Sequence, residues 1–162
     1  DVPALAAFAR EEGHTLRLIE YMDVGSSNGW RLDEVVPASE ILAQLHARYP
    51  LEPLSASRPG EVANRYRYLD GVGEIGLIAS VSAPFCGDCT RARVSADGHL
   101  YTCLFASEGS DLKRYLRPVL DAAALRDALH ARWSARDDRY SEIRDAETAN
   151  RLPKVEMFRV GG

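Results

Sequence analysis

The residues best suited to chemistry in this sequence are its three cysteines, Cys86, Cys89 and Cys103. The first two form a C-x2-C motif, and the third follows after thirteen intervening residues. An odd number of thiols cannot all pair as disulfides, whereas three thiolates can hold an iron–sulfur cluster and leave one iron without a protein ligand. Such an iron is an open position at which a substrate can bind.

Two arginines, Arg91 and Arg93, follow the second cysteine closely. On a solvated strand such side chains are usually surface charges. Beside an open iron, however, two guanidinium groups offer paired donors that match the oxygens of a phosphate. The net charge of −4 gives no general attraction for nucleic acid or an anionic membrane, so any anion must be bound locally.

The identity of the metal depends on its fourth ligand. Structural zinc takes four protein ligands, and the nearest candidate beyond the thiols is His99, four residues before Cys103. A four-iron cluster accepts three cysteines and an open site. A buried group of thiols without metal is the third interpretation, although it does not explain the C-x2-C spacing around Gly87. Spacing alone leaves these interpretations open.

A β-hairpin is predicted to position these residues. The sequence Ser95-Ala96-Asp97-Gly98 suits a type I turn with a left-handed glycine, which pairs Ser95 with His99. Counting outward places Arg93 opposite Tyr101. A two-residue turn would shift the register by one and mix apolar with charged side chains on the same face, so the first register is preferred.

This register sorts the side chains of the hairpin into two faces, because successive residues of a strand alternate. One face is predicted to hold the candidate metal-binding and anion-binding residues, and on it Arg91 lies opposite Cys103. The residues of this face are Cys89, Arg91, Arg93, Tyr101 and Cys103. The other is mostly apolar and is predicted to face the core: Ala92, Val94, Leu100, Thr102 and Leu104.

The elements around the hairpin change character along the chain. A helix over 2–10 and a strand over 16–22 form half of a βαβ unit, whose parallel partner strand is not expected within this chain. A second helix follows between Pro37 and Pro50, and 51–60, with two prolines, is predicted as a linker. Strands are then predicted over 62–69, 74–82, 90–95 and 99–105, and helices over 111–117 and 121–136. The fold class is therefore α/β to α+β, with domains over 1–50 and 51–162.

The composition supports a folded, soluble protein. The chain has 162 residues, 46% of them hydrophobic, which is enough for one or two small cores. The sequence shows neither an apolar run of membrane-spanning length nor a signal segment, so we expect an intracellular protein. Reduced thiols agree with that compartment.

Three motifs of the sequence resemble one family. Residues 83–93 (APFCGDCTRAR), with Asp97-Gly98 and 101–105 (YTCLF), resemble the C-terminal cluster motif of the GTP 3′,8-cyclase family of molybdenum-cofactor biosynthesis. Residues 17–22 (RLIEYM) resemble the last barrel strand of that family, and 159–162 (RVGG) resemble its diglycine tail. The motifs occur in the family's order and span the chain. This resemblance favours iron–sulfur over zinc.

The resemblance implies a radical S-adenosylmethionine (SAM) enzyme, a cytoplasmic lyase that converts GTP to 3′,8-cyclo-7,8-dihydro-GTP. It implies that residues 1–50 are the end of a partial α/β barrel. It also implies that residues 51–162 form a C-terminal domain of antiparallel strands and helices, which carries an iron–sulfur cluster and binds GTP.

The resemblance also implies roles for single residues. Cys86, Cys89 and Cys103 would hold a 4Fe-4S cluster, and Arg91 and Arg93, with the backbone at Ala92, would contact GTP. Met22 would line the SAM site, although a methionine on a strand is more often part of a core. Gly161 and Gly162 would reach the active site, although terminal glycines usually fray.

One departure from the family is large. The family's radical cluster needs an amino-terminal C-x3-C-x2-C motif, and the three cysteines of this sequence are already assigned. We therefore expect this chain to be the C-terminal half of the enzyme and inactive alone. Its expected partners are GTP, the missing amino-terminal half, which shares the SAM site, and a second copy in a homodimer. The alternative function is a zinc-stabilised binding module whose Arg91 and Arg93 bind acidic groups.

Overall fold

The computed structural model of the chain describes residues 1–145, 149 and 154–159. The chain divides into two compact units. The first comprises Asp1–Met22 and Trp30–Thr90, and the second comprises Asp23–Gly29 and Arg91–Gly162. Among the described residues, no helix combines the length and apolar character needed to span a membrane.

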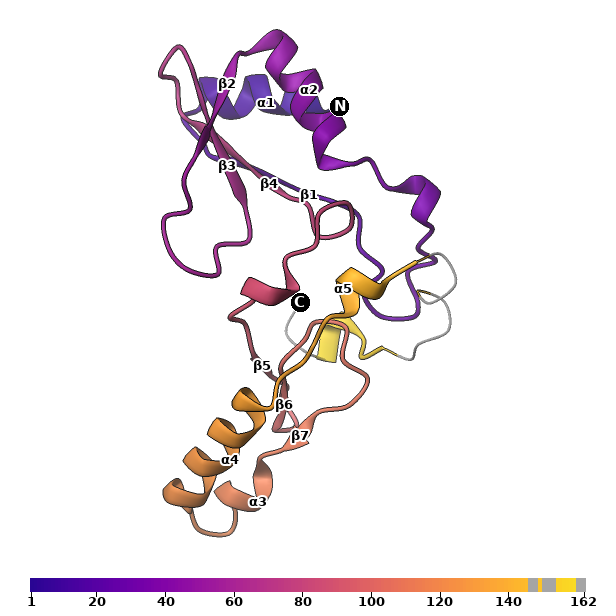
Figure 1. Cartoon of the computed structure of the whole chain (residues 1–162), viewed down its shortest axis with the longest axis vertical. Helices are drawn as coiled ribbons and strands as arrows, with labels where there is room; N and C mark the ends of the chain where they lie inside the picture. The colour runs from indigo at the N-terminus through magenta and orange to yellow at the C-terminus, as the bar shows by residue number, and fades with distance from the viewer. Residues whose placement is uncertain (146–148, 150–153, 160–162) are drawn as a thin grey trace. The chain divides into compact units, whose positions relative to one another are not determined.

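The first unit contains a four-stranded mixed sheet (Figure 1). Its strands are β1 (Leu16–Ile19), β2 (Leu51–Leu54), β3 (Asn64–Tyr68) and β4 (Glu74–Ile78), in the order β1-β4-β3-β2. β1 pairs in parallel with β4, and the other neighbours are antiparallel. The expectation that the parallel partner of the first strand lies outside this chain was therefore wrong, since β4 occupies that position.

Two helices pack on this sheet. α1 (Val2–Glu11) begins where the Asp1 carboxylate caps the Ala4 N–H, and the left-handed Gly13 follows it, as the sequence predicted. α2 (Ala38–Arg48) lies between Pro37 and Pro50, as predicted, and follows the short 3-10 turn η1 (Leu32–Glu34). Both helices contribute to one apolar core with the sheet: Ala6, Ala38, Ile41, Leu45, Leu51, Tyr68, Ile75, Leu77 and Ala79.

The predicted linker over 51–60 is partly wrong, because its first four residues form β2. Pro53 lies within that strand, opposite Tyr66 of β3. β2 is at the edge of the sheet, and an edge strand tolerates proline because the missing N–H is on the side that has no neighbouring strand. The predicted hairpin of β3 and β4 is confirmed.

The second unit is built around a small antiparallel sheet (Figure 1). Its strands are β5 (Arg93–Val94), β6 (His99–Tyr101) and β7 (Ser110–Asp111), in that order. The helices are α3 (Lys113–Leu116), α4 (Ala122–Ser134) and α5 (Tyr140–Ile143), and the 3-10 turn η3 spans Met157–Arg159. The helix predicted over 121–136 is α4, and none of its residues is fully buried.

The predicted register of the β5–β6 hairpin is confirmed. Arg93 lies opposite Tyr101, Ser95 donates its N–H to the carbonyl of His99, and Gly98 has a φ of 80°. The predicted division into faces is only partly correct, because Val94 is 59% exposed whereas Tyr101 is buried. β5 is an edge strand of two residues, so its apolar side chain has no layer to pack against.

Candidate functional site

Cys86 begins the 3-10 turn η2 (Cys86–Asp88) of the first unit, and Cys89 follows that turn directly as its C-cap. The N–H of Cys89 donates to the carbonyl of Cys86 at 3.2 Å, which fixes the spacing of the two residues. The loop that contains Gly60 approaches this turn closely. A β-carbon on Gly60 would lie 2.3 Å from the hydroxyl of Thr90, so only glycine permits the approach.

Cys103 follows β6 in the second unit. Its sulfur accepts the N–H of Phe105 at 3.4 Å, and its carbonyl accepts the N–H of Ala106 at the same distance. Hydrogen bonds to sulfur stabilise the thiolate form and tune metal–sulfur sites. The neighbouring side chains of Thr102 and Phe105 are buried, which holds this corner of the backbone in place.

The three cysteines are divided between the two units, and none of them is in a disulfide. All three residues are half-buried. Three reduced thiols are the donor set that soft metals and iron–sulfur clusters require. In the described part of the chain, no three His, Cys, Asp or Glu side chains gather as a metal site. His99, the predicted fourth zinc ligand, places its Nδ1 3.3 Å from Asp97.

The predicted GTP-binding residues lie at the start of the β5–β6 hairpin. Arg91 and Arg93 are half-buried, whereas Ala92 is exposed. The strand ladder extends only to Arg93, so the predicted pairing of Arg91 with Cys103 does not form as a strand pair. The structure therefore brings Arg93 into the predicted register and leaves Arg91 on the segment before it.

Two further predictions concern the ends of other segments. Met22 is half-buried and lies three residues beyond the end of β1, so it is not in the strand that was predicted to carry it. Gly161 and Gly162 lie outside the described residues.

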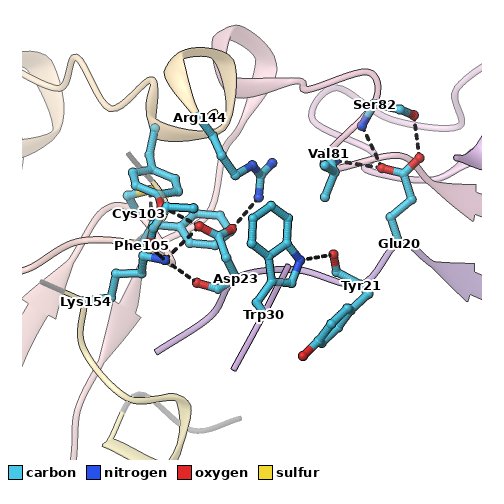
Figure 2. Close-up of polar contacts among 12 residues, drawn as sticks. Glu20, Tyr21, Asp23, Trp30, Val81, Ser82, Cys103, Phe105, Arg144 and Lys154 are labelled. Atoms are coloured by element: carbon cyan, nitrogen blue, oxygen red, sulfur yellow. Dashed lines mark hydrogen bonds and ion pairs between the residues drawn. The ribbon is translucent and has the colours of Figure 1, made fainter. Parts of the chain in front are cut away.

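Sequence reasoning missed a buried ionic cluster in the second unit (Figure 2). One carboxylate oxygen of Asp23 lies 2.6 Å from Nη1 of Arg144, and the other lies 2.8 Å from Nζ of Lys154. The hydroxyl of Tyr140 also donates to Asp23. The side chains of Asp23, Arg144 and Lys154 are 2%, 1% and 3% exposed, so their charges are compensated within the protein.

The electrostatics of this cluster favour the ionised carboxylate. Burial raises the pKa of Asp23, but the hydrogen bonds from Lys154, Tyr140 and Arg144 outweigh burial and hold that pKa below its ordinary value. Burial and the bond to Asp23 both raise the pKa of Tyr140, which therefore stays a donor. The ring of Tyr140 stacks on Phe105 at 4.6 Å between centroids, so the cluster also supports the backbone beside Cys103.

A second buried carboxylate, Glu20, lies in the first unit (Figure 2). It accepts the N–H groups of Ala38, Val81 and Ser82 at 2.7, 2.7 and 2.8 Å, together with the hydroxyl of Ser82. Burial raises the pKa of Glu20, and these four bonds together hold it below its ordinary value. Glu20 thereby joins the start of α2 to the turn that follows β4.

The sequence carried a signal for one of these carboxylates. Glu20 alternates with the half-buried Leu16 and Leu18, and a charged residue in that pattern marks a buried polar contact. Asp23 had no such signal, because it begins a polar, glycine-bearing loop.

The comparisons with known proteins agree on one family. The family Molybdenum Cofactor Synthesis C matches residues 14–142. A GTP 3′,8-cyclase of Xanthomonas campestris is 58% identical over 153 residues, covering 94% of this chain and 44% of that protein. One from Acidothermus cellulolyticus is 50% identical over 186 residues, covering 100% of this chain and 51% of that protein.

A third relative, from another organism, gives the same result. The GTP 3′,8-cyclase of Synechococcus sp. (strain CC9605) is 52% identical over 158 residues, covering 98% of this chain and 44% of that protein. The chain thus spans about half the length of the curated relatives it matches. It belongs to the Molybdenum Cofactor Synthesis C family and corresponds to the C-terminal portion of the GTP 3′,8-cyclases.

Proposed function

We propose that this chain is the C-terminal half of a radical SAM GTP 3′,8-cyclase, which converts GTP to 3′,8-cyclo-7,8-dihydro-GTP in molybdenum-cofactor biosynthesis. The observation that carries the proposal is the identity of 50–58% to GTP 3′,8-cyclases over 94–100% of the chain. In this proposal the chain binds and orients GTP, and the amino-terminal half starts the reaction. The chain alone does not turn over.

Cys86, Cys89 and Cys103 are the residues that would hold a 4Fe-4S cluster. When bound, a cluster with three cysteine ligands supplies one iron that can take the guanine base as a ligand. Two of these cysteines come from one short segment, the η2 turn and the residue after it, and the sulfur of the third accepts the N–H of Phe105.

Arg91 and Arg93 are proposed to bind the triphosphate of GTP, with the backbone at Ala92 as a further contact. A guanidinium group is always charged and donates to two oxygens at once. Two such groups within three residues, on a chain of net charge −4, concentrate positive charge where an anion is needed. Their half-buried position removes part of the competing water.

Met22 is proposed to line the SAM site, and Gly161 and Gly162 are proposed to reach the reacting groups. Glycine lets a backbone approach a ligand more closely than any other residue does. Under this proposal residues 1–50 complete a partial barrel that the amino-terminal half begins, and residues 51–162 hold the cluster and GTP.

The first unit offers a surface for that missing half. β1 is an edge strand of the sheet formed by the described residues, and Ile19 at its end is 55% exposed. On the neighbouring α1, Leu5 and Phe8 are 47% and 55% exposed. An edge strand with apolar side chains is a template for a further strand. We propose that a strand of the amino-terminal half pairs with β1.

The function is tested on the complete enzyme, in which this chain is joined to the amino-terminal half that its relatives carry. After anaerobic reconstitution with iron and sulfide, we expect conversion of GTP to the cyclised product. Cys103→Ser should abolish that conversion and lower the iron content of the isolated chain. Full activity of Cys103→Ser would contradict the ligation.

Metal analysis separates the proposal from a zinc-binding module. The chain should contain iron and acid-labile sulfide, and His99→Gln should not change either content. One equivalent of tightly held zinc, lost in His99→Gln, would support the zinc module instead.

A further inference from the structure

The segment that precedes the chain terminus is fastened to the second unit by contacts along its length. Nζ of Lys154 donates to Asp23 at its carboxylate and its carbonyl, both at 2.8 Å. The N–H of Val155 donates to the carbonyl of Ala106 at 3.1 Å. Nη2 of Arg159 lies 3.3 Å from Asp97, at the tip of the β5–β6 hairpin. Residues 154–159 are therefore held from several directions.

The carboxylate of Glu156 is hydrogen-bonded to the loop that begins at Asp23. It accepts the N–H of Ser26 at 2.8 Å and the hydroxyl of Ser27 at 3.1 Å. A β-carbon on Gly25 would lie 2.2 Å from Oε2 of Glu156, and Gly25 has a φ of 69°. The backbone conformation therefore favours glycine at this position, and a β-carbon there would displace the Glu156 carboxylate.

The same loop is also linked to the surroundings of one proposed cluster ligand, Cys103. It begins directly after Met22, the proposed SAM-lining residue, and its first residue, Asp23, contacts Tyr140, which stacks on Phe105 beside Cys103. Residues 23–27 are thus attached to the support of a proposed cluster ligand, and they also hold residues 154–156.

The distance along the chain limits where the terminus can go. Gly162 is the third residue after Arg159. Extended backbone covers at most about 3.6 Å per residue, so the terminus stays within about 11 Å of Arg159. Covalent length alone therefore keeps Gly161 and Gly162 close to the segment over residues 154–159.

We propose that residues 23–27 are a clasp for residues 154–159, and that Gly25 and Glu156 are positioning residues which direct the terminal Gly161 and Gly162 to the reacting groups of GTP. This inference rests on the proposed function. The clasp contributes geometry and no proton transfer. A misplacement of about 1 Å at a reacting group lowers a rate by about 100-fold, so a loosened clasp affects catalysis more than binding.

The test uses Gly25→Ala in the complete enzyme, with Gly29→Ala as the matched control. Both glycines lie in the same loop with positive φ, but a β-carbon on Gly29 meets nothing within 4 Å. The two substitutions thus share the backbone strain, and only Gly25→Ala displaces the Glu156 carboxylate. Glu156→Ala, and the double variant Gly25→Ala with Glu156→Ala, complete a mutant cycle.

Hydrogen exchange and kinetics are measured on the same variants. We expect Gly25→Ala and Glu156→Ala to speed exchange in peptides covering residues 24–30 and 154–159 by about tenfold or more, while Gly29→Ala does not affect 154–159. The kcat for GTP cyclisation should fall by about 10- to 100-fold, with the Kd for GTP changed by less than about twofold. The double variant should lose less than the product of the single losses.

The outcomes separate the clasp from the proposed function. Unchanged exchange at 154–159 in Gly25→Ala would overturn the clasp. Faster exchange with an unchanged kcat would show a merely structural strap and overturn the positioning role. A parent enzyme without cyclase activity would overturn the proposed function and the positioning role with it, and the exchange data would still decide whether the clasp exists.

Discussion

Glu20 and Asp23 are both buried carboxylates and stand three residues apart, yet they lie in different compact units and are neutralised in different ways. Glu20 is surrounded by uncharged donors, three backbone N–H groups and a hydroxyl. Asp23 is surrounded by two cations and a phenol. Both arrangements keep the carboxylate ionised, because each holds the pKa below its ordinary value.

The difference lies in what remains when the carboxylate charge is removed. Around Glu20, only neutral N–H groups lose an acceptor, and each such loss has a limited cost. Around Asp23, Arg144 and Lys154 are left as buried charges, which is a far larger penalty. The neutral arrangement joins neighbouring segments of one unit, whereas the ionic one ties a loop to residues more than a hundred positions away.

The largest predicted effect is that of Asp23→Asn. It should lower the unfolding free energy of the second unit by about 3–5 kcal/mol, since two buried cations lose their counter-ion. Pulsed hydrogen exchange across a urea series reports the two units separately. Asp33→Asn is the control, because its pair with Arg31 is exposed and should give no measurable change. If Asp23→Asn lowers the unfolding free energy by no more than the loss of an exposed ion pair does, the distinction between the two carboxylates is wrong.

The second prediction concerns Glu20→Gln, a substitution of nearly equal shape. It should destabilise the first unit by about 1–3 kcal/mol, because the amide cannot accept all the N–H groups that the carboxylate accepts. Exchange in peptides from α2 and the turn after β4 should rise, while peptides from the second unit stay unchanged. Equal losses in both units, or a loss exceeding that of Asp23→Asn, would contradict the comparison.

The third prediction is the pH dependence of the Asp23 cluster. The folded pKa of Asp23 lies below its ordinary value of 3.8, so the folded state binds fewer protons than the unfolded state. The stabilisation is therefore complete above pH 3.8 and is lost as the pH falls through the folded pKa. The stability difference between parent and Asp23→Asn should be constant from neutral pH to about pH 5 and shrink below pH 3.8. A difference that grows on acidification would show the wrong sign.

The sequence predicted those features whose determinants lie close together in the chain. The register of the β5–β6 hairpin follows from four turn residues, Ser95 to Gly98, and is confirmed. Likewise, the C-x2-C spacing places Cys86 and Cys89 on one turn. The position of α2 between Pro37 and Pro50 was also predicted correctly.

The sequence did not predict features that depend on distant partners. The parallel pairing of β1 with β4 places Leu16 opposite Ile75. The hydrophobic periodicity of a short segment does not identify a pairing partner so far away in the sequence. β2 was missed because Pro53 argues against a strand unless the strand is known to be an edge. The partners of Asp23 lie 117, 121 and 131 residues away, so this polar loop residue gave no sign of burial.

The smallest predicted effect concerns Asp97. This carboxylate is exposed, so it extends the comparison with Glu20 and Asp23 to a group whose pKa is little affected by burial. Hydrogen bonds from the Ser95 hydroxyl and then from His99 lower its pKa to about 2. Ser95→Ala removes the larger contribution and should raise the pKa toward the ordinary value of 3.8, with His99→Gln giving a smaller rise. The carboxyl carbon shift of Asp97, followed by NMR over the pH range in which the chain stays folded, measures both. If Ser95→Ala leaves the titration unchanged, local donors do not set this pKa, and the same explanation for Glu20 would also be in doubt.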